Sequence, residues 1–287
     1  MRSIKFLTLI TALFMAASAA MGAVTIRTTG VRVGDIFSIE ETFPAGTKSA
    51  TISFNGVTLP LMPDGSGKWS ALLGVDLEAA EGPAPLTITH TLSGGEKYAE
   101  EVPLNILPRV FREQHITVDD SKVFLSDEDR ERANRENREI RAVLAKTTDK
   151  RLWDSSFIVP IKGRYSSPFG LQRYYNGEKG SYHSGLDIAA AKGAEISSAS
   201  EGRVALVGDY FYTGNTVFID HGLGLYTAYF HMESVAVKEG EMVGLGELLG
   251  KVGSTGRSTG PHLHWGVYVG GVKVDPLSLV SVTKNLD

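Results

Sequence analysis

The sequence predicts a mainly β protein in which a charged helix separates two β regions. Short runs of alternating apolar and polar residues, bounded by glycine-rich turns, occupy residues 24–108 and again residues 153–287. Between them, residues 127–145 lack this alternation and carry opposite charges at helical spacing. A length of 287 residues agrees with about two domains. We therefore expect an N-terminal immunoglobulin-like β-sandwich, a charged helical linker over residues 109–152 and a C-terminal antiparallel β-sheet folded into a groove.

The first 23 residues have the layout of a secretory signal peptide. Arg2 and Lys5 precede an apolar run over residues 6–17, and small residues follow up to Ala23. The apolar run is too short for a convincing membrane span. The sequence contains no cysteine, which excludes both a cysteine-linked lipid anchor and a disulfide. We expect an exported protein of the periplasm or extracellular cell envelope, without a membrane anchor; the cleavage site stays open.

Residues 24–108 are expected to form the β-sandwich. Asn55 and Gly56 supply the positive φ angles of a type I′ turn between two alternating strands, which predicts a hairpin. A second hairpin is expected around the turn at residues 93–96. Together with strands near residues 34–40 and 68–73, these give six or seven short strands, a number typical of an immunoglobulin-like sandwich. No catalytic cluster stands out here, so positioning, regulation or inert spacing are the roles left open.

Residues 127–145 are expected to form a helix that begins after Ser126. Ser126 is a good N-cap, and the acidic residues that follow it favour the first turn of a helix. Glu128/Arg132 and Glu131/Arg135 have the spacing of stabilising ion pairs. Apolar residues appear late, at positions 140, 143 and 144. We expect a solvated helix whose C-terminal end packs on another element.

From residue 153 onward, β-strand patterns return. Strands are predicted near residues 202–207, 215–220, 225–231 and 262–269, with glycine-rich turns between them. Residues 243–253 indicate a pair of turns followed by a core strand. A mainly antiparallel sheet that folds into an open groove follows. Strands hold side chains from both sides, which suits groups that need fixed geometry.

This C-terminal region carries five residues of the kinds that bind and assist a catalytic metal: His183, Asp187, His231, His262 and His264. A catalytic zinc takes three protein ligands and keeps a fourth position for water. Five candidates exceed that need by two. Metal-assisted hydrolysis also needs uncoordinated groups that move protons and stabilise the developing oxyanion. The set therefore indicates a hydrolase with a metal site.

The spacing of these residues supports in part a site with three metal ligands and two uncoordinated groups. Alternate residues of a strand point to one face, so His262 and His264 should look into the same groove. His183 and Asp187 are four residues apart and would share a face of a helix, but Gly185 and the residues after Asp187 favour a loop that enters a strand. The fold must then bring His183 and Asp187 together.

The same residues lie in sequence blocks that resemble the LytM-type zinc peptidases of family M23, which cut bacterial cell-wall cross-links. The blocks are H-S-G-L-D at residues 183–187, Y-F-H ending at His231, G-S-T-G-R-S-T-G-P at residues 253–261 and H-L-H at residues 262–264. The resemblance runs from about residue 157 to residue 276 and includes S-P-F-G at residues 167–170. These blocks in this order are highly specific to the family.

The resemblance implies an exported endopeptidase that hydrolyses the peptide cross-links of peptidoglycan. It makes His183, Asp187 and His264 the ligands of one zinc ion per chain, and His231 and His262 the uncoordinated catalytic pair. Which histidine acts as base and which as oxyanion or acid helper stays open, as does the bond that is cut. The loops at residues 174–181 and 253–261 are expected to form groove walls. By comparison with family proenzymes, the 127–145 helix could also lie over one edge of the groove.

Two functions other than catalysis are compatible with parts of this pattern. A non-catalytic LytM-like regulator that activates a cell-wall amidase is disfavoured because such relatives have lost zinc ligands, whereas all five positions are present here. A zinc-binding protein without catalysis would leave two histidines without a task. His221, His90 and His115 are expected to be structural or without function.

The charge balance bears on the partners. The chain has a net charge of −4 and no basic cluster, so nucleic acid is not an expected partner. No oligomerisation heptad is present, and the oligomeric state stays open.

Overall fold

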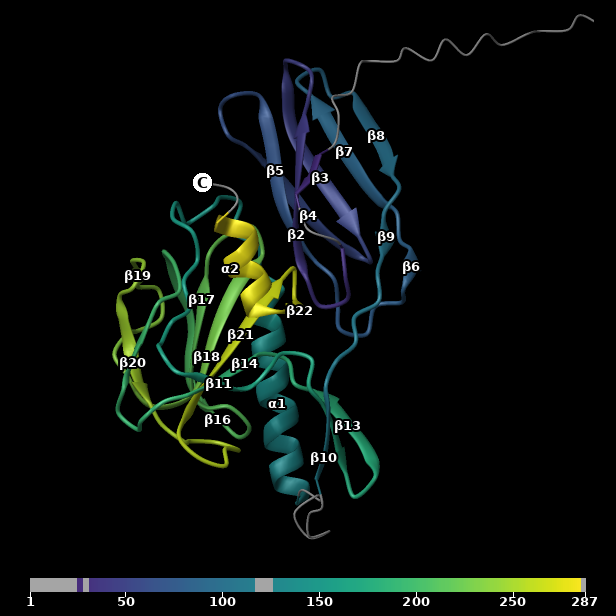
Figure 1. Cartoon of the computed structure of the whole chain (residues 1–287). Helices are drawn as coiled ribbons and strands as arrows, with labels where there is room; N and C mark the ends of the chain where they lie inside the picture. The colour runs from purple at the N-terminus through teal and green to yellow at the C-terminus, as the bar shows by residue number, and fades with distance from the viewer. Residues whose placement is uncertain (1–24, 28–30, 117–125, 285–287) are drawn as a thin grey trace, which may run out of the picture.

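The computed structural model describes residues 25–27, 31–116 and 126–284 (Figure 1). The predicted signal peptide of residues 1–23 lies outside the described residues. Two β regions lie beside each other, with the N-terminal strands in purple and blue and the C-terminal strands in green and yellow. The predicted mainly β fold is confirmed. No helix in the described part of the chain is long and apolar enough to cross a membrane.

The N-terminal region is built on one antiparallel seven-stranded path in the order β1-β2-β5-β4-β3-β7-β8. Both predicted hairpins form, and Asn55 and Gly56 have the positive φ angles (46° and 80°) that the turn requires. Phe37 of β2 and Phe54 of β3 do not lie on neighbouring strands, yet their rings meet edge to face at 5.5 Å. The path therefore folds over into two layers around a common core. The strands are β1 (Thr25–Arg27), β2 (Ile36–Thr42), β3 (Thr47–Phe54), β4 (Val57–Pro63), β5 (Lys68–Gly74), β7 (Leu86–Leu92) and β8 (Lys97–Val102), with β6 (Gly82–Pro83) paired to β9 (Asn105–Ile106).

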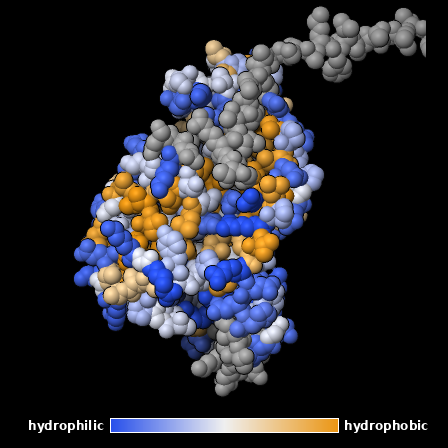
Figure 2. Space-filling view, in the orientation of Figure 1, coloured by the Kyte–Doolittle hydropathy of each residue, from blue (hydrophilic) through white to orange (hydrophobic). Residues whose placement is uncertain are grey.

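The linker contains the predicted helix α1 (Asp127–Leu144) and one strand that was not predicted, β10 (Glu113–Ile116). Ser126 caps α1, because its Oγ accepts a hydrogen bond from the Asp129 amide at 3.1 Å. Arg132 forms an ion pair at 2.6 Å with Glu136, four residues toward the C-terminus, rather than with the expected Glu128, four residues toward the N-terminus. Most residues of α1 are exposed and charged or polar. Figure 2 shows that hydrophilic side chains dominate the lower part of this face of the molecule.

The C-terminal region forms a curled, ten-stranded, antiparallel sheet in which β14, β21, β18 and β17 are the central neighbours. The predicted antiparallel sheet is confirmed. The sheet is followed by the short helix α2 (Pro276–Lys284), which was not predicted. The strands are β11 (Arg164–Ser167), β14 (Leu186–Ala189), β15 (Glu195–Ser197), β16 (Gly202–Tyr210), β17 (Gly214–Asp220), β18 (Leu225–Val235), β19 (Met242–Val243), β20 (Leu248–Val252), β21 (His262–Val269) and β22 (Val272–Val274).

The segment at residues 174–181, expected as a loop, belongs instead to a hairpin of β12 (Gln172–Tyr175) and β13 (Glu178–Tyr182). The physical reason is an Asn-Gly turn: Asn176 and Gly177 take φ angles of 50° and 88°. This hairpin and β10 form a separate three-stranded sheet in the order β10-β12-β13. The hairpin leads directly into His183.

The two faces of the large sheet have different partners. On one face of β18, Tyr226, Ala228 and Phe230 lie in a cluster with Val143 and Leu144 of α1, which confirms that the C-terminal end of the helix packs. The opposite face belongs to an apolar core that continues into the N-terminal region. The Ile36 amide of β2 also donates to Ser278 Oγ of α2 at 2.9 Å. Since one core runs through both regions, the domain divisions at residues 108 and 152 remain predictions.

Candidate active site

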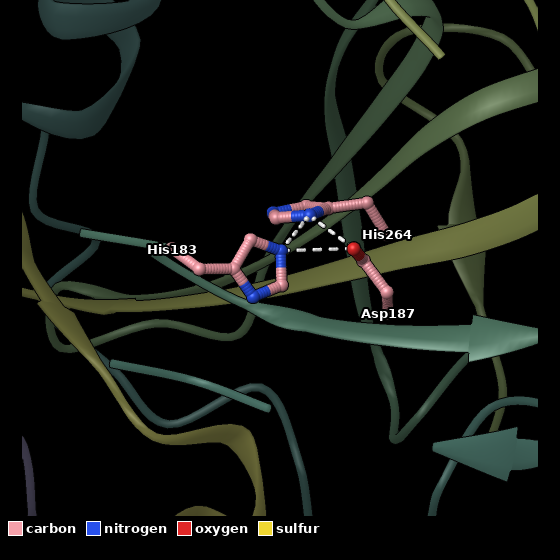
Figure 3. A group of neighbouring side chains, drawn as sticks. All are labelled: His183, Asp187 and His264. Carbon is pink, nitrogen blue, oxygen red and sulfur yellow. Dashed lines mark hydrogen bonds and ion pairs between the residues drawn. The ribbon is translucent and has the colours of Figure 1, made fainter. Parts of the chain in front are cut away.

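His183, Asp187 and His264 converge on one point (Figure 3). Asp187 of β14 lies directly opposite His264 of β21 in the strand register, and His183 follows the end of β13. Asp187 Oδ1 lies 2.9 Å from His183 Nε2 and 2.8 Å from His264 Nδ1. The two histidine nitrogens lie 3.1 Å apart. A loop and two paired strands thus bring together residues that are up to 81 positions apart in the sequence.

The hydrogen bonds of the three residues show what the cluster can bind. His183 Nδ1 donates to the Pro168 carbonyl at 2.8 Å, which leaves the Nε2 lone pair of the neutral ring directed at Asp187. Burial alone would raise the pKa of Asp187, but its hydrogen bonds with His183 and His264 hold that pKa below the usual range. Burial lowers the pKa of His264 and favours its neutral form. An anionic carboxylate and two imidazoles at this spacing form a donor set that fits zinc.

Neighbouring side chains hold two of these residues in place. Ser167 Oγ lies 3.3 Å from His183 Nδ1, and Arg173 Nη2 donates to the same hydroxyl at 3.2 Å. On the other side, the Phe230 ring stacks on His264 with centroids 5.2 Å apart and planes 4° from parallel. Such contacts restrict the orientation of metal-binding imidazoles.

His231 lies in β18 beside this cluster and has an unusual backbone. Its φ angle of 63° is in the left-handed region, which non-glycine residues rarely adopt, and the His231 amide donates to the Thr213 carbonyl at 2.8 Å. His231 Nδ1 donates to the Thr255 carbonyl at 2.9 Å, so Nε2 is the proton-accepting nitrogen of the neutral ring. Burial lowers the pKa of His231 to about 4, with His264 and His262 contributing in the same direction. His231 is therefore neutral at physiological pH.

His262 is held in a matching way from the same loop. His262 Nδ1 donates to the Gly260 carbonyl at 2.8 Å, and Nε2 lies 3.7 Å from Asp187 Oδ1. The ring centroids of His231 and His262 are 4.8 Å apart. Two imidazoles thus lie side by side next to the donor cluster, and both have Nδ1 anchored to carbonyls of residues 253–261. This pair can accept and donate protons beside whatever the cluster binds.

The structure therefore brings all five predicted residues together, and it places the remaining histidines elsewhere. His221 is fully buried, with Nδ1 donating to the Glu201 carbonyl at 2.6 Å and Nε2 lying 2.8 Å from Thr227 Oγ1, an arrangement that serves packing. His90 is buried in β7, and His115 is an exposed residue of β10.

Sequence reasoning missed the groups that orient these imidazoles. The carbonyls of Pro168, Thr255 and Gly260 accept the histidine protons, but every residue has a carbonyl, so no residue type signals this role. Ser167 and Pro168 did lie in the S-P-F-G block and could have been found there.

Comparison with known proteins agrees with this geometry. Residues 181–276 match the family model of peptidase family M23. A relative named DD-carboxypeptidase/endopeptidase Mpg from Neisseria meningitidis is 39% identical over 123 residues, which cover 43% of this chain and 28% of the relative. Peptidoglycan DD-endopeptidase ShyA from Vibrio cholerae is 37% identical over 120 residues, which cover 42% of this chain and 28% of that protein. The chain thus spans under a third of the length of these relatives.

A solved structure extends the similarity to the N-terminal region. A protein from Pseudomonas aeruginosa, provisionally described as a peptidase M23, superposes with a TM-score of 0.68 at 28% sequence identity. The superposition covers 88% of this chain and 95% of that chain. The similarity therefore includes both β regions.

Proposed function

We propose that the protein, whose residues 181–276 match the model of peptidase family M23, is an exported zinc metalloendopeptidase that hydrolyses peptide cross-links of bacterial peptidoglycan. The observation that carries the proposal is the convergence of His183, Asp187 and His264, with the imidazoles of His231 and His262 beside them. A metal cluster alone would support only binding. The adjacent pair of oriented imidazoles supports hydrolysis.

The metal would be held by His183 Nε2, Asp187 Oδ1 and His264 Nδ1, the three atoms that face one another. Zinc bound there would supply a water of lowered pKa and polarise the scissile carbonyl. Asp187 contributes the negative charge that offsets part of the charge of a divalent cation. Pro168 and Phe230 fix the two imidazole planes, so the ligand atoms need little rearrangement on binding.

The proton transfers belong to His231 and His262. Each ring is held as the tautomer with hydrogen on Nδ1, so each Nε2 can accept a proton. One of them takes the proton of the attacking water, and the other stabilises the oxyanion or protonates the leaving amine. The low pKa of His231, caused by burial, keeps this ring ready to accept a proton at neutral pH.

Peptidoglycan is proposed as the substrate because two relatives of the peptidase region are named as peptidoglycan or DD-type endopeptidases. Export is proposed from the sequence of residues 1–23, and it agrees with a substrate in the cell envelope. Zinc is proposed from the chemistry of the donor set.

The decisive experiment incubates the protein with purified cross-linked muropeptides, with and without a zinc chelator. We expect conversion of dimers to monomers, its loss on chelation and its return on adding zinc. Zinc binding without cleavage would favour a zinc-binding protein without catalysis. A protein that neither binds zinc nor cleaves would favour the regulator that activates an amidase.

A further inference from the structure

The linker between the two β regions contributes a strand to the hairpin that carries His183. Strand β10 pairs in parallel with β12, from Glu113 opposite Gln172 to Ile116 opposite Tyr175. One step earlier, the Gln172 amide donates to the Arg112 carbonyl at 2.9 Å. In Figure 1 the linker runs down beside the hairpin of β12 and β13, of which β12 is the strand that pairs with it. We call residues 109–116 the brace segment.

The start of the brace segment is anchored to both β regions by one side chain. Arg109 donates from Nη1 to Asp35 of the N-terminal region at 2.9 Å and from Nη2 to Asp275, at the start of α2, at 2.6 Å. The Arg109 guanidinium also lies 5.2 Å from the centre of the Phe111 ring. The guanidinium and Phe111 are only partly exposed, so these contacts are weakly screened by solvent.

Phe111 packs against two residues next to His183, namely Gly170 and Tyr182. Its ring contacts Gly170 so closely that a Cβ at Gly170 would overlap it. The Phe111 ring also lies 5.8 Å from that of Tyr182, the residue before His183. Gly170 in turn is tied to the metal-binding residue, because its amide donates to the His183 carbonyl at 2.8 Å. Phe111 thus packs against both the residue that hydrogen-bonds to the His183 carbonyl and the residue that precedes His183.

A second, polar route runs from the brace segment to the His183 ring. Gln114 Oε1 accepts from Arg173 Nε at 3.3 Å, and Arg173 Nη2 donates to Ser167 Oγ at 3.2 Å. Ser167 Oγ lies 3.3 Å from His183 Nδ1. This route is more exposed and its distances are longer, so the apolar contact of Phe111 is the stronger restraint.

We infer that Phe111 is a positioning residue for His183, through which the linker sets the zinc affinity of the peptidase site. This inference rests on the proposed function. Among the described residues, Phe111 contacts none of His183, Asp187 and His264; it packs against Gly170 and Tyr182, which lie next to the His183 backbone, while the His183 amide also donates to the Leu171 carbonyl at 2.9 Å. The functional peptidase unit then begins at the brace segment, ahead of the division predicted at residue 153.

The test measures the zinc dissociation constant of the full chain by competition with a chelator. We expect Phe111→Ala to weaken zinc binding by about tenfold or more, the range typical of residues that support a metal ligand. Phe111→Leu keeps an apolar side chain against Gly170 and should recover most of the affinity. His115→Ala is the matched control: His115 also lies in the brace segment and stacks on Tyr174 of β12 at 4.6 Å, but it is exposed, and among the described residues it contacts neither Gly170 nor Tyr182.

Zinc affinity and folding are read separately. The melting temperature of the zinc-free protein reports any general loss of structure, and Phe111→Leu remains informative if Phe111→Ala does not fold. Phe111→Ala with zinc affinity within about twofold of wild type, or His115→Ala with an equal loss, would overturn the inference. Failure of the wild-type protein to bind zinc would instead overturn the proposed function.

Discussion

At the scale of single residues, the site is defined by where lone pairs point. His183 Nε2, Asp187 Oδ1 and His264 Nδ1 lie 2.8–3.1 Å from one another, although the hydrogen bond from His183 Nδ1 to Pro168 leaves no proton on Nε2 of the neutral ring. His264 Nδ1 can carry a proton that it donates to Asp187 Oδ1, whereas His183 Nε2 faces the carboxylate with a lone pair. The three atoms lie close enough together for one metal ion to bind all of them.

Removing any of the three proposed ligands should abolish stoichiometric zinc binding. We expect His183→Ala, Asp187→Ala and His264→Ala each to weaken zinc binding by orders of magnitude, because two protein ligands replace three. Elemental analysis after gel filtration measures the bound zinc. Near-stoichiometric zinc in all three variants would show that the ligands are elsewhere.

The two neighbouring imidazoles should behave differently. His231→Ala and His262→Ala should each keep zinc and lose hydrolysis of cross-linked muropeptides by about a hundredfold to several thousandfold, the usual contribution of such groups. Zinc content and melting temperature are the controls. A folded variant that binds zinc and keeps more than about a tenth of the wild-type rate would remove that histidine from the catalytic pair.

At the scale of elements, the N-terminal sandwich contains buried polar groups that its strands do not pair. Glu41 of β2 is 1% exposed and His90 of β7 is fully buried, and within the described chain neither side chain has a hydrogen-bond partner. Burial raises the pKa of Glu41 to about 7, and the charge of Glu100 on β8 adds to this shift. Burial lowers the pKa of His90. Glu41 is thus a carboxyl that the folded state prefers to keep protonated.

This preference makes stability depend on pH. The folded-state pKa of Glu41 lies above its ordinary value of 4.5, so its contribution is complete below about pH 4.5 and disappears as the pH rises through about 7. We compare the free energy of unfolding of Glu41→Gln with that of wild type at each pH. Between pH 5 and pH 8, this difference should change in favour of Glu41→Gln by about 2 kcal/mol.

Urea unfolding of wild type and Glu41→Gln at pH 5 and pH 8 measures this difference. His90 is present in both proteins, and its contribution to stability depends on pH in the opposite way to that of Glu41. Because its pKa is lowered, His90 contributes stability above the ordinary histidine pKa, and this contribution is lost as the pH falls. The difference between the two proteins therefore isolates Glu41. Equal pH dependence in both would show that Glu41 is ionised in the folded protein.

At the scale of the whole molecule, the two β regions are joined by a shared core. Gly74 of β5 packs against Val274 of β22 so closely that a Cβ would lie 2.6 Å from a Val274 methyl carbon. Leu59 of β4 approaches Gly224 beside β18, and Arg109 pairs with acids of both regions. Relative motion of the regions would open this core to water.

The shared core predicts one cooperative unfolding transition. Calorimetry and tryptophan fluorescence should give coincident midpoints, since Trp69 belongs to the N-terminal region and Trp265 to the C-terminal region. Gly74→Val should lower the common midpoint or split it, because the added methyl groups push β5 away from β22. Two separate transitions in the wild-type protein would contradict a shared core.

The sequence by itself determined the β-rich fold, the hairpin at Asn55-Gly56 and the helix after Ser126, because each depends on local periodicity, turn chemistry or capping. It also indicated the five candidate site residues, since imidazoles and carboxylates in family-like blocks are visible without coordinates. The β12–β13 hairpin could have been found from Asn176-Gly177, but the glycine-rich segment was expected as a loop.

The tertiary structure decided how those residues work together. The β14–β21 register places Asp187 opposite His264, and the carbonyls of Pro168, Thr255 and Gly260 select the tautomers of three histidines. It also adds β10 to the hairpin before His183 and buries the Glu41 carboxyl without a hydrogen-bond partner among the described residues. These features depend on contacts between residues far apart in the chain and on backbone groups common to all residues, so no local pattern in the sequence encodes them.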